Sequence, residues 1–449
     1  MAEKLQTTND DLLARIMDWL DAHDSADHMV KEQVVAAVRD LPGAATESGV
    51  DDAAVALAEE ALVNGDTGNA EQLWQEIGDA CVARGESAAA AEAARKQGAL
   101  TFLHDSAAAI GHYERAVELD SDNPNGWNEL GHLYRCVGNL QEAESAYRHV
   151  LTLGESRNDH MVIAAAAGNL GNMYRTRGEI DQAESMFLKS LAFHELLGHR
   201  EDMANDYGNL GNIFFVRQQF DQARAMYRKA LEFDEELGRR EYVASDYGNL
   251  GNVYRTLGDL DQAEAMYRKA LEVHEALGCQ KGMASDCWNL GTLYRTTGKF
   301  DQAEAMYRQS LEIEEALGRR EGMAVNYGSL GAVYGMRGEL DQAETMYRKA
   351  LEISEALGDR KGMVNSYENL GTIYRTRGEF DQAEAMYLKS IASKEVLGDR
   401  KGMANSYENL GFVCERSGKL KEARRYWEKA RDLFAEPDSP SAEAVQSMH

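Results

Sequence analysis

A repeat of 40 residues constrains the fold of this chain more than any other feature. The dipeptide Leu-Gly returns at a constant spacing of 40 residues, and the tripeptide Asp-Gln-Ala keeps the same period. The Leu-Gly pairs begin at Leu130, Leu170, Leu210, Leu250, Leu290, Leu330, Leu370 and Leu410. Because a short repeat buries its apolar face only against its neighbours, this period predicts a stack of units rather than one globular core.

Each repeat has the pattern of two helices, as the copy between residues 360 and 397 illustrates. Met363, Tyr367, Leu370 and Tyr374 follow the spacing of one helical face, which predicts a first helix over about 361–377. Gly371 lies inside that helix, where glycine costs ~1 kcal/mol relative to alanine. We therefore expect the missing side chain to let the second helix pack closely.

The second helix of this copy is predicted to begin at Asp381. Gly378 is of the type that ends a helix, Asp381 and Glu384 have the spacing of a capping box, and Gly398 ends the second helix. The residues of this helix that we expect to be buried are Ala383, Met386, Tyr387, Ile391, Val396 and Leu397.

These repeats resemble the tetratricopeptide family. The family's signature is matched by Trp127-x2-Leu130-Gly131-x2-Tyr134 followed by Ala143-x3-Tyr147, and later copies have Tyr207 or Tyr367 in place of the tryptophan. The resemblance covers about 51–435, and the 40-residue period is similar to the Partner-of-Inscuteable and kinesin-light-chain branch rather than the usual 34. It implies an all-α, right-handed superhelical α-solenoid of stacked antiparallel helix pairs that binds other proteins and is not an enzyme.

The ends of the chain depart from the repeat pattern. We expect a disordered N-terminus at 1–8, a helical cap or docking module with a linker at 9–50, degenerate helix pairs at 51–123, eight repeat units at 124–435 and a disordered tail at 436–449. Terminal units of a solenoid need a more polar outer face, which suits the degenerate pairs. The pattern does not decide whether residues 9–41 are a cap or an adaptor.

The polar residues of the first helices form the candidate binding site. In the tetratricopeptide family these helices line the concave surface, and here they carry Asn, Ser, Thr and Arg with few acids. The candidate groove residues are Asn169, Asn172, Arg175, Asn205, Asn209, Asn212, Asn249, Asn252, Arg255, Trp288, Asn289, Arg295, Asn365, Asn369, Arg375, Asn405 and Asn409. An asparagine amide can pair with any peptide backbone, and arginine offers a rigid fork to a carboxylate. The pattern therefore favours an extended ligand that contains Asp or Glu.

A purely structural reading of the same residues stays open. The asparagines could bond to neighbouring helices, and the arginines could pair with acids of the adjacent unit such as Glu179, Asp259 or Glu379. Trp288 replaces a glycine of other copies, and Gly335 replaces an arginine. These departures indicate either a side-chain pocket or neutral drift.

Composition and motifs argue against other functions. The net charge of −28 disfavours nucleic acid and anionic lipid as partners. The chain has no HExxH motif, metal-ligating Cys/His cluster or phosphate loop, so we expect no metal or cofactor. The five cysteines form no CxxC pair, and the start has no apolar leader segment, which favours reduced thiols in the cytoplasm. His194 and His274 are interpreted as residues that favour a helix C-terminus.

The sequence thus predicts a cytoplasmic interaction scaffold whose groove holds a partner peptide. Two alternatives remain. One is a structural protein that assembles through its ends or convex faces. The other is a sensor or regulatory subunit that docks an effector through residues 9–41.

Overall fold

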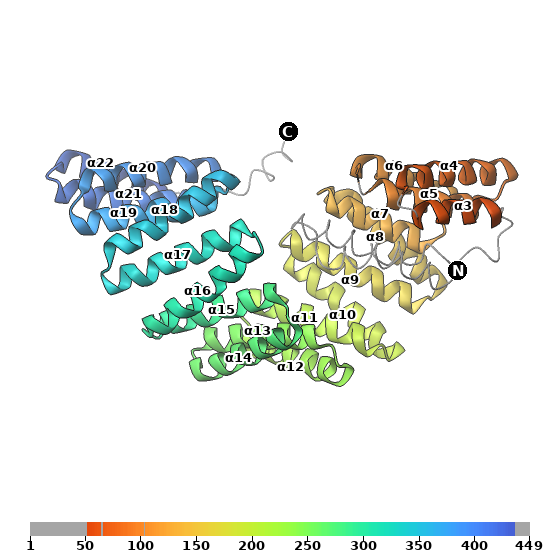
Figure 1. Ribbon diagram of the computed structural model, residues 1–449, viewed down its shortest axis with the longest axis horizontal. Helices are drawn as coiled ribbons and strands as arrows, with labels where there is room; N and C mark the ends of the chain where they lie inside the picture. The colour runs from red at the N-terminus through yellow and green to blue at the C-terminus, as the bar shows by residue number, and fades with distance from the viewer. Residues whose placement is uncertain (1–51, 64–65, 103, 436–449) are drawn as a thin grey trace. The chain divides into compact units, whose positions relative to one another are not determined.

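The computed structural model describes residues 52–63, 66–102 and 104–435. Over these residues it contains twenty helices and no strand (Figure 1). The all-α fold predicted from the repeat is therefore confirmed. The segments 1–8 and 9–50 and the tail 436–449, for which we predicted disorder, a cap or a docking module, lie outside the described residues.

The helices follow one another with short connections. The first ten are α3 (Asp52–Val63), α4 (Thr67–Arg84), α5 (Ser87–Thr101), α6 (Ser106–Leu119), α7 (Pro124–Cys136), α8 (Leu140–Arg157), α9 (His160–Thr176), α10 (Ile180–Leu197), α11 (Arg200–Val216) and α12 (Phe220–Leu237). The next ten are α13 (Arg240–Leu257), α14 (Leu260–Leu277), α15 (Gln280–Thr296), α16 (Phe300–Ala316), α17 (Arg320–Arg337), α18 (Leu340–Leu357), α19 (Arg360–Arg377), α20 (Phe380–Leu397), α21 (Arg400–Arg416) and α22 (Leu420–Ala435).

The chain divides into two compact units. The first ends at Phe233 and the second begins at Asp234. Within each unit consecutive helices pack as pairs, such as α9 with α10 and α19 with α20, and the second helix of a pair packs on the first helix of the next. We call the odd-numbered helices from α7 to α21 the A-helices and the even-numbered helices from α8 to α22 the B-helices. Neighbouring A-helices also touch, as α15 and α17 do, so within a unit their outward side chains form one surface, the A-face.

The ends of the helices follow mostly from local sequence. Asp359 accepts a hydrogen bond from the Lys361 amide at the start of α19, and Gly378 ends that helix with φ +80°. The predicted capping box at Asp381 and Glu384 was wrong, because α20 begins at Phe380 and its cap residue makes no side-chain hydrogen bond. Glu384 instead pairs with Lys419 of the following repeat at 2.8 Å.

The glycine inside each A-helix allows the close packing that the sequence predicted. A Cβ added to Gly371 would lie 3.0 Å from the ring of Tyr387, and one added to Gly251 would lie 2.5 Å from the ring of Tyr267. Both tyrosines are fully buried. The ring of the B-helix therefore rests directly on the backbone of the A-helix, where a side chain would collide with it.

The predicted core of the B-helix is correct in its middle and wrong at its end. Ala383, Tyr387 and Ile391 are buried and Met386 is half-buried, but Val396 is 64% exposed and Leu397 is 39% exposed. With about 100° of rotation per residue, Val396 lies roughly 140° around the helix from Ile391. Val396 and Leu397 are therefore largely outside the packing between the B-helix and its neighbouring A-helices, although both are apolar.

Buried polar pairs join each B-helix to the following A-helix. His194 Nδ1 lies 2.7 Å from Asp206 Oδ2, and His274 Nδ1 lies 2.6 Å from Asp286 Oδ2. These histidines lie near helix C-termini as predicted, but they also hold successive repeats together through their carboxylate partners. The equivalent place in another repeat holds the carboxylates of Asp234 and Asp246.

Candidate functional site

The predicted groove residues lie on the A-helices and differ in exposure. Within an A-helix the candidate side chains occupy three ladder positions, spaced four and then three residues apart, as in Asn205, Asn209 and Asn212. In the first ladder position Asn205, Asn365 and Asn405 are exposed. In the second position the half-buried residues are Asn209, Asn249, Asn289, Asn369 and Asn409. The A-helices thus place amides at the surface of each unit, as the four-residue spacing requires.

The third ladder position serves the stack. Asn212 Oδ1 accepts a hydrogen bond from the hydroxyl of Tyr227 at 2.8 Å, and Asn252 Oδ1 accepts one from Tyr267 at the same distance. Thr292 makes the equivalent contact with its tyrosine at 3.0 Å. These side chains satisfy the polar end of a buried tyrosine, so their first role is structural. The sequence pattern did not separate this position from the two above it.

Two other predicted residues join neighbouring A-helices. Asn169 is buried, and its Nδ2 donates to Asn128 Oδ1 at 2.7 Å. Trp288 is half-buried on α15, and its Nε1 donates to Ser329 Oγ of α17 at 3.1 Å. Asn169 is therefore part of the helix packing, whereas Trp288 keeps part of its ring at the surface.

The predicted arginines reach the A-face without a carboxylate partner among the described residues. Arg175 is exposed, and Arg255, Arg295 and Arg375 are half-buried. Their hydrogen bonds go to neutral groups: Arg255 Nε and Arg295 Nε each lie 3.4 Å from a tyrosine hydroxyl, and Arg375 Nη1 lies 3.3 Å from Asn409 Oδ1. Arg175 Nη2 similarly contacts Asn172 at 3.3 Å. We call Arg255, Arg295 and Arg375 the arginine column of the second unit.

The acids that we named as possible partners of the predicted arginines make other contacts. Asp259 accepts a hydrogen bond from the Gln262 amide at 3.3 Å, at the start of α14. Glu179 pairs with Arg177 at 2.8 Å, and Glu379 pairs with Arg377 at 3.9 Å, so the partner is the arginine two residues beyond the predicted one. The reading in which the predicted arginines bond to Glu179 or Glu379 is therefore not what the structure contains.

A recurring network accounts for the acids of the B-helices. Glu304 accepts hydrogen bonds from Tyr334 at 2.6 Å, Arg337 at 2.6 Å and Arg308 at 3.0 Å. Although burial opposes it, these three donors lower the pKa of Glu304. Glu144 and Glu344 have the equivalent tyrosine and both equivalent arginines as partners. Glu264 has the tyrosine and Arg268, with Lys299 in place of the second arginine. We call this arrangement the Glu–Tyr–Arg network; it joins each B-helix to the next A-helix.

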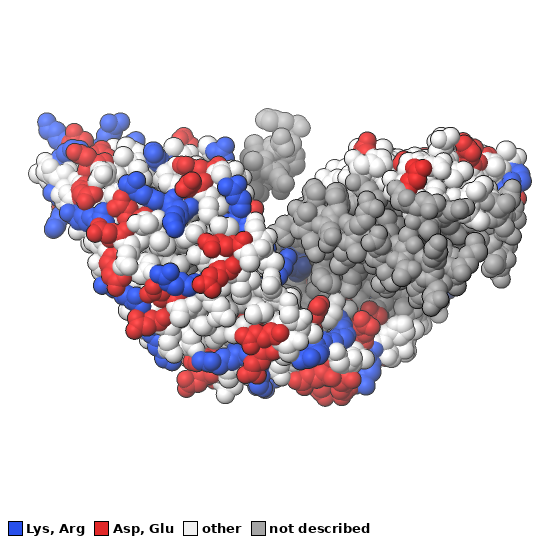
Figure 2. All heavy atoms as spheres, in the orientation of Figure 1, with Lys and Arg blue, Asp and Glu red and all other residues white. Residues whose placement is uncertain are grey.

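Charges elsewhere on the second unit are mixed, as the network requires. Figure 2 shows Lys and Arg interleaved with Asp and Glu over the visible surface of this unit. At the far end of the A-face Glu368 is bound by Lys394 Nζ at 2.5 Å, and Glu408 and Glu415 are exposed. The arginine column on α13, α15 and α19 thus has no carboxylate partner among the described residues.

Helix α17 presents small residues to the A-face. Gly328 and Gly335 stand where α15 has Trp288 and Arg295. A Cβ on Gly328 would meet nothing within 4 Å, and one on Gly335 would meet only Ile373 at 3.9 Å. The surface of α17 beside Trp288 is therefore open at Gly328, and whether the departures from the repeat form a side-chain pocket or reflect neutral drift stays open.

Over residues 52–63, 66–102 and 104–435, no group of three His, Cys, Asp or Glu side chains is placed to hold a metal ion. Nor does any helix in that part combine the length and apolar character needed to cross a membrane. The five cysteines are free, and three of them are buried.

Comparison with known proteins identifies the repeat. The family model for the tetratricopeptide repeat matches residues 123–195, 202–276, 283–356, 322–395 and 362–436. Among curated proteins, no sequence matches the chain significantly.

Several solved structures resemble the chain in fold. The quorum sensor NprR from B. thuringiensis, in its apo form, is 16% identical with a TM-score of 0.53, and the match covers 73% of this chain and 96% of that one. Aspartyl phosphate phosphatase F from Bacillus subtilis is 12% identical with a TM-score of 0.53, covering 74% and 90%. A putative kinesin light chain from Podosopora anserina with nearly identical repeats is 16% identical with a TM-score of 0.39, covering 44% and 96%. At these identities the likeness concerns the fold alone. With the family model matching most of its length, the chain belongs to the tetratricopeptide-repeat family, whose helical arrays are typically non-catalytic scaffolds for protein interaction.

Proposed function

We propose that the A-face of the second unit binds an extended, acid-containing segment of a partner protein, and that the chain is a non-catalytic scaffold. The contrast between two sets of arginines carries the proposal. Arg337 and Arg377 are each held by carboxylates, whereas the arginine column on the A-face contacts only neutral groups. A half-exposed guanidinium without a counter-ion can form a charge-assisted pair with a ligand carboxylate.

The amides beside this column suit the backbone of the same ligand. Asn249, Asn289 and Asn369 are half-buried on successive or nearby A-helices, and Asn365 is exposed. Each amide offers a donor and an acceptor, so together they can hold a peptide without reading its side chains. Under this division of labour the asparagines supply sequence-independent affinity and the arginines select acids.

The small residues of α17 add a place for one larger side chain. The ring of Trp288 lies on one side of this place, and the side-chain-free backbone of α17 at Gly328 and Gly335 leaves the space beside it open. An aromatic ring next to unoccupied surface favours contact with an apolar or aromatic side chain of the ligand. We therefore expect the bound segment to combine acids with one bulky residue.

Affinity capture with three forms of the full chain tests this function. The wild type is compared with Arg255→Glu/Arg295→Glu/Arg375→Glu and with a control that changes charge equally at the opposite ends of A-helices, about 22 Å along the helix from the arginine column. That control is Arg240→Glu/Arg320→Glu/Arg360→Glu, at the exposed first residues of three A-helices. The partner should be retained by the wild type and the control and lost from the first variant. Equal recovery of the same proteins by all three forms would refute the proposal.

Self-assembly is a second candidate, which the last helix pair favours. Phe412 is 43% exposed, Leu420 67% and Phe434 50%, so α21 and α22 offer apolar surface that inner repeats cover with a neighbour. In light scattering over a concentration series, a mass that rises above 49.8 kDa would support assembly. A constant monomer mass at all concentrations would exclude it.

A further inference from the structure

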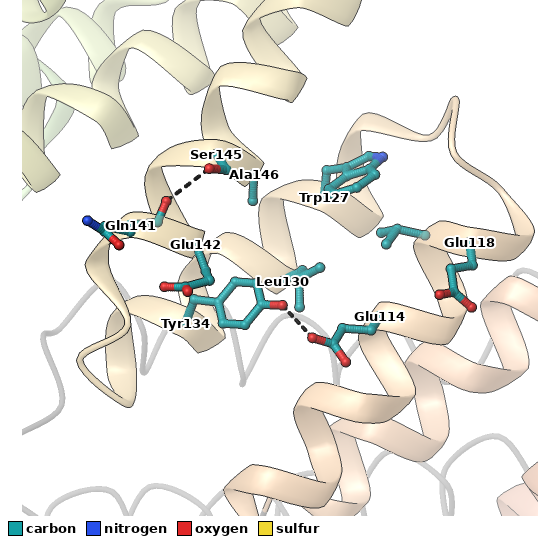
Figure 3. A pocket seen from close by; sticks show the side chains of 10 residues that line it. Glu114, Glu118, Trp127, Leu130, Tyr134, Gln141, Glu142, Ser145 and Ala146 are labelled. Carbon is teal, nitrogen blue, oxygen red and sulfur yellow. Dashed lines mark hydrogen bonds between the residues drawn. The ribbon is translucent and has the colours of Figure 1, made fainter.

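A pocket of about 670 Å³ lies in the first unit, where α7 meets α6 and α8 (Figure 3). The carboxylates of Glu114, Glu118 and Glu142 line it together with the rings of Trp127 and Tyr134. Neither lysine nor arginine is among its described lining residues. This volume is within the usual range of ligand pockets and is large enough to accept a long side chain.

The aromatic walls are held in place by their own contacts. Trp127 Nε1 donates to the Ser121 carbonyl at 2.8 Å, and its ring packs against His149 with 4.4 Å between centroids. The Tyr134 hydroxyl donates to Glu114 Oε1 at 2.5 Å, the contact drawn in Figure 3. Burial and this hydrogen bond raise the pKa of Tyr134, so the hydroxyl stays a proton donor.

The acids of the pocket are not neutralised. Glu118 and Glu142 form no ion pair with any residue that the structure describes. Glu142 also stands where the later repeats have glutamine, as at Gln262 and Gln302. The pocket therefore gathers more negative charge than the same place in those copies.

Four later repeats reveal what this place normally contains. There an arginine of the B-helix donates to the hydroxyl of the tyrosine equivalent to Tyr134, within the Glu–Tyr–Arg network. The pairs are Arg148–Tyr174 at 2.6 Å, Arg268–Tyr294 at 2.7 Å, Arg308–Tyr334 at 2.7 Å and Arg348–Tyr374 at 2.8 Å. The tyrosine of this motif thus accepts a guanidinium in four copies of one chain.

In the pocket the guanidinium is replaced by a carboxylate. Aligning the buried pair Ala109 and Tyr113 with Ala143 and Tyr147 puts Glu114 at the position of Arg148. The second cation of the network is missing as well, because Val137 stands at the position of Arg177 in the next repeat. The pocket thus keeps the tyrosine and the space for a guanidinium, but neither cation of the Glu–Tyr–Arg network is present there.

We propose that this pocket binds the guanidinium of an arginine in a basic segment of a partner protein, which takes the place that an internal arginine fills in the later repeats. Arginine fits better than lysine, because its planar fork can meet two carboxylates while its face stacks on Trp127 or Tyr134. This site is independent of the arginine column, since it would select a ligand of opposite charge.

Titration of the full chain with acetyl-Ala-Arg-Ala-amide tests the site. The indole N–H signal of Trp127, assigned with Trp127→Phe, should shift and saturate, while that of Trp288 should not. The citrulline peptide, which has nearly the same shape without the charge, should produce no saturable shift. The lysine peptide should bind more weakly than the arginine peptide.

Variants with matched controls decide the mechanism. Glu114→Arg, which restores the residue of the later repeats, should weaken binding at least tenfold. Glu142→Gln should weaken it about fivefold, the factor for one charge at roughly 4 Å in water. Glu272→Gln is the control, because Glu272 is exposed at the position of Glu118 in a repeat whose site already contains Arg268; its affinity should stay within twofold.

Equal affinities for Glu142→Gln and Glu272→Gln would overturn the proposal, because binding would then reflect only the net charge of the chain. Equal shifts with the citrulline peptide would also overturn it. Glu142→Gln keeps the test decisive even if Glu114→Arg fails to fold.

Discussion

Two alanine substitutions in one helix should have opposite effects on stability. Gly248 and Gly251 both lie in α13, three residues apart, and neither has a positive φ. A Cβ on Gly248 would meet nothing within 4 Å, whereas one on Gly251 would lie 2.5 Å from Cε1 and 2.6 Å from Cδ1 of Tyr267. We expect Gly248→Ala to stabilise the repeat and Gly251→Ala to destabilise it.

The magnitudes follow from two separate effects. Alanine gains up to ~1 kcal/mol over glycine as a helix former, and this gain applies to both variants. At Gly251 the ring of Tyr267 is 0% exposed, so it cannot move without displacing its neighbours, and overpacking of this kind costs about 1–3 kcal/mol. The difference in free energy of unfolding between the two variants isolates the packing cost of about 1–3 kcal/mol.

Native-state hydrogen exchange is the suitable assay, because a repeat array need not unfold in a single step. The exchange rates of the α13 and α14 amides give the local opening free energy for the wild type and both variants. Urea unfolding followed by circular dichroism gives the global comparison. If Gly251→Ala protects these amides as well as Gly248→Ala does, the contact between glycine and tyrosine does not constrain the repeat.

Three further substitutions test the polar contacts between and within repeats. Glu304→Gln should lower the free energy of unfolding by about 1–2 kcal/mol, because it weakens two hydrogen bonds that join α16 to α17 and a third within α16; an unchanged urea midpoint would contradict this. Tyr267→Phe should cost about 1 kcal/mol through loss of the bond to Asn252, and a thermal midpoint equal to that of the wild type would show that the bond contributes nothing. Burial and the neighbouring carboxylate of Asp234 raise the pKa of Asp246 to about 8, so the folded state binds more protons than the unfolded state between roughly pH 4 and pH 8, and stability should fall as pH rises through that window. Asp246→Asn should remove this fall, and urea midpoints that depend on pH equally in both proteins would refute the assignment.

The fold could be predicted from the sequence because the repeat supplies the same information many times. The positions of Leu370, Gly371 and Tyr387 recur every 40 residues. In each repeat the aromatic ring of the B-helix therefore meets the glycine of the A-helix. The ends of the B-helices were less predictable. Val396 and Leu397 are apolar but lie outside the packed face. The cap predicted at Asp381 was wrong because α20 begins one residue earlier, at Phe380.

The candidate site was only partly predictable for a different reason. Periodicity places Asn209 and Asn212 on the same helical face, yet only the three-dimensional packing assigns Asn212 to Tyr227. Likewise Arg375 and Arg377 are both near acids in the sequence, and only the structure gives the acids to Arg377. For the pocket between α6, α7 and α8, the sequence signal is the replacement of the arginine at the position of Arg148 by Glu114, which becomes visible when repeats of different length are aligned.

The most direct test of the account measures which peptides the chain selects. Random twelve-residue peptides displayed on phage are selected on the wild type, on Arg255→Glu/Arg295→Glu/Arg375→Glu and on Arg240→Glu/Arg320→Glu/Arg360→Glu. Although the chain carries a net charge of −28, we predict that peptides rich in Asp and Glu are enriched on the wild type and on the second variant and are absent from the first. Failure to enrich acidic peptides on the wild type, or equal enrichment on all three proteins, would contradict the claim that the arginine column binds the ligand.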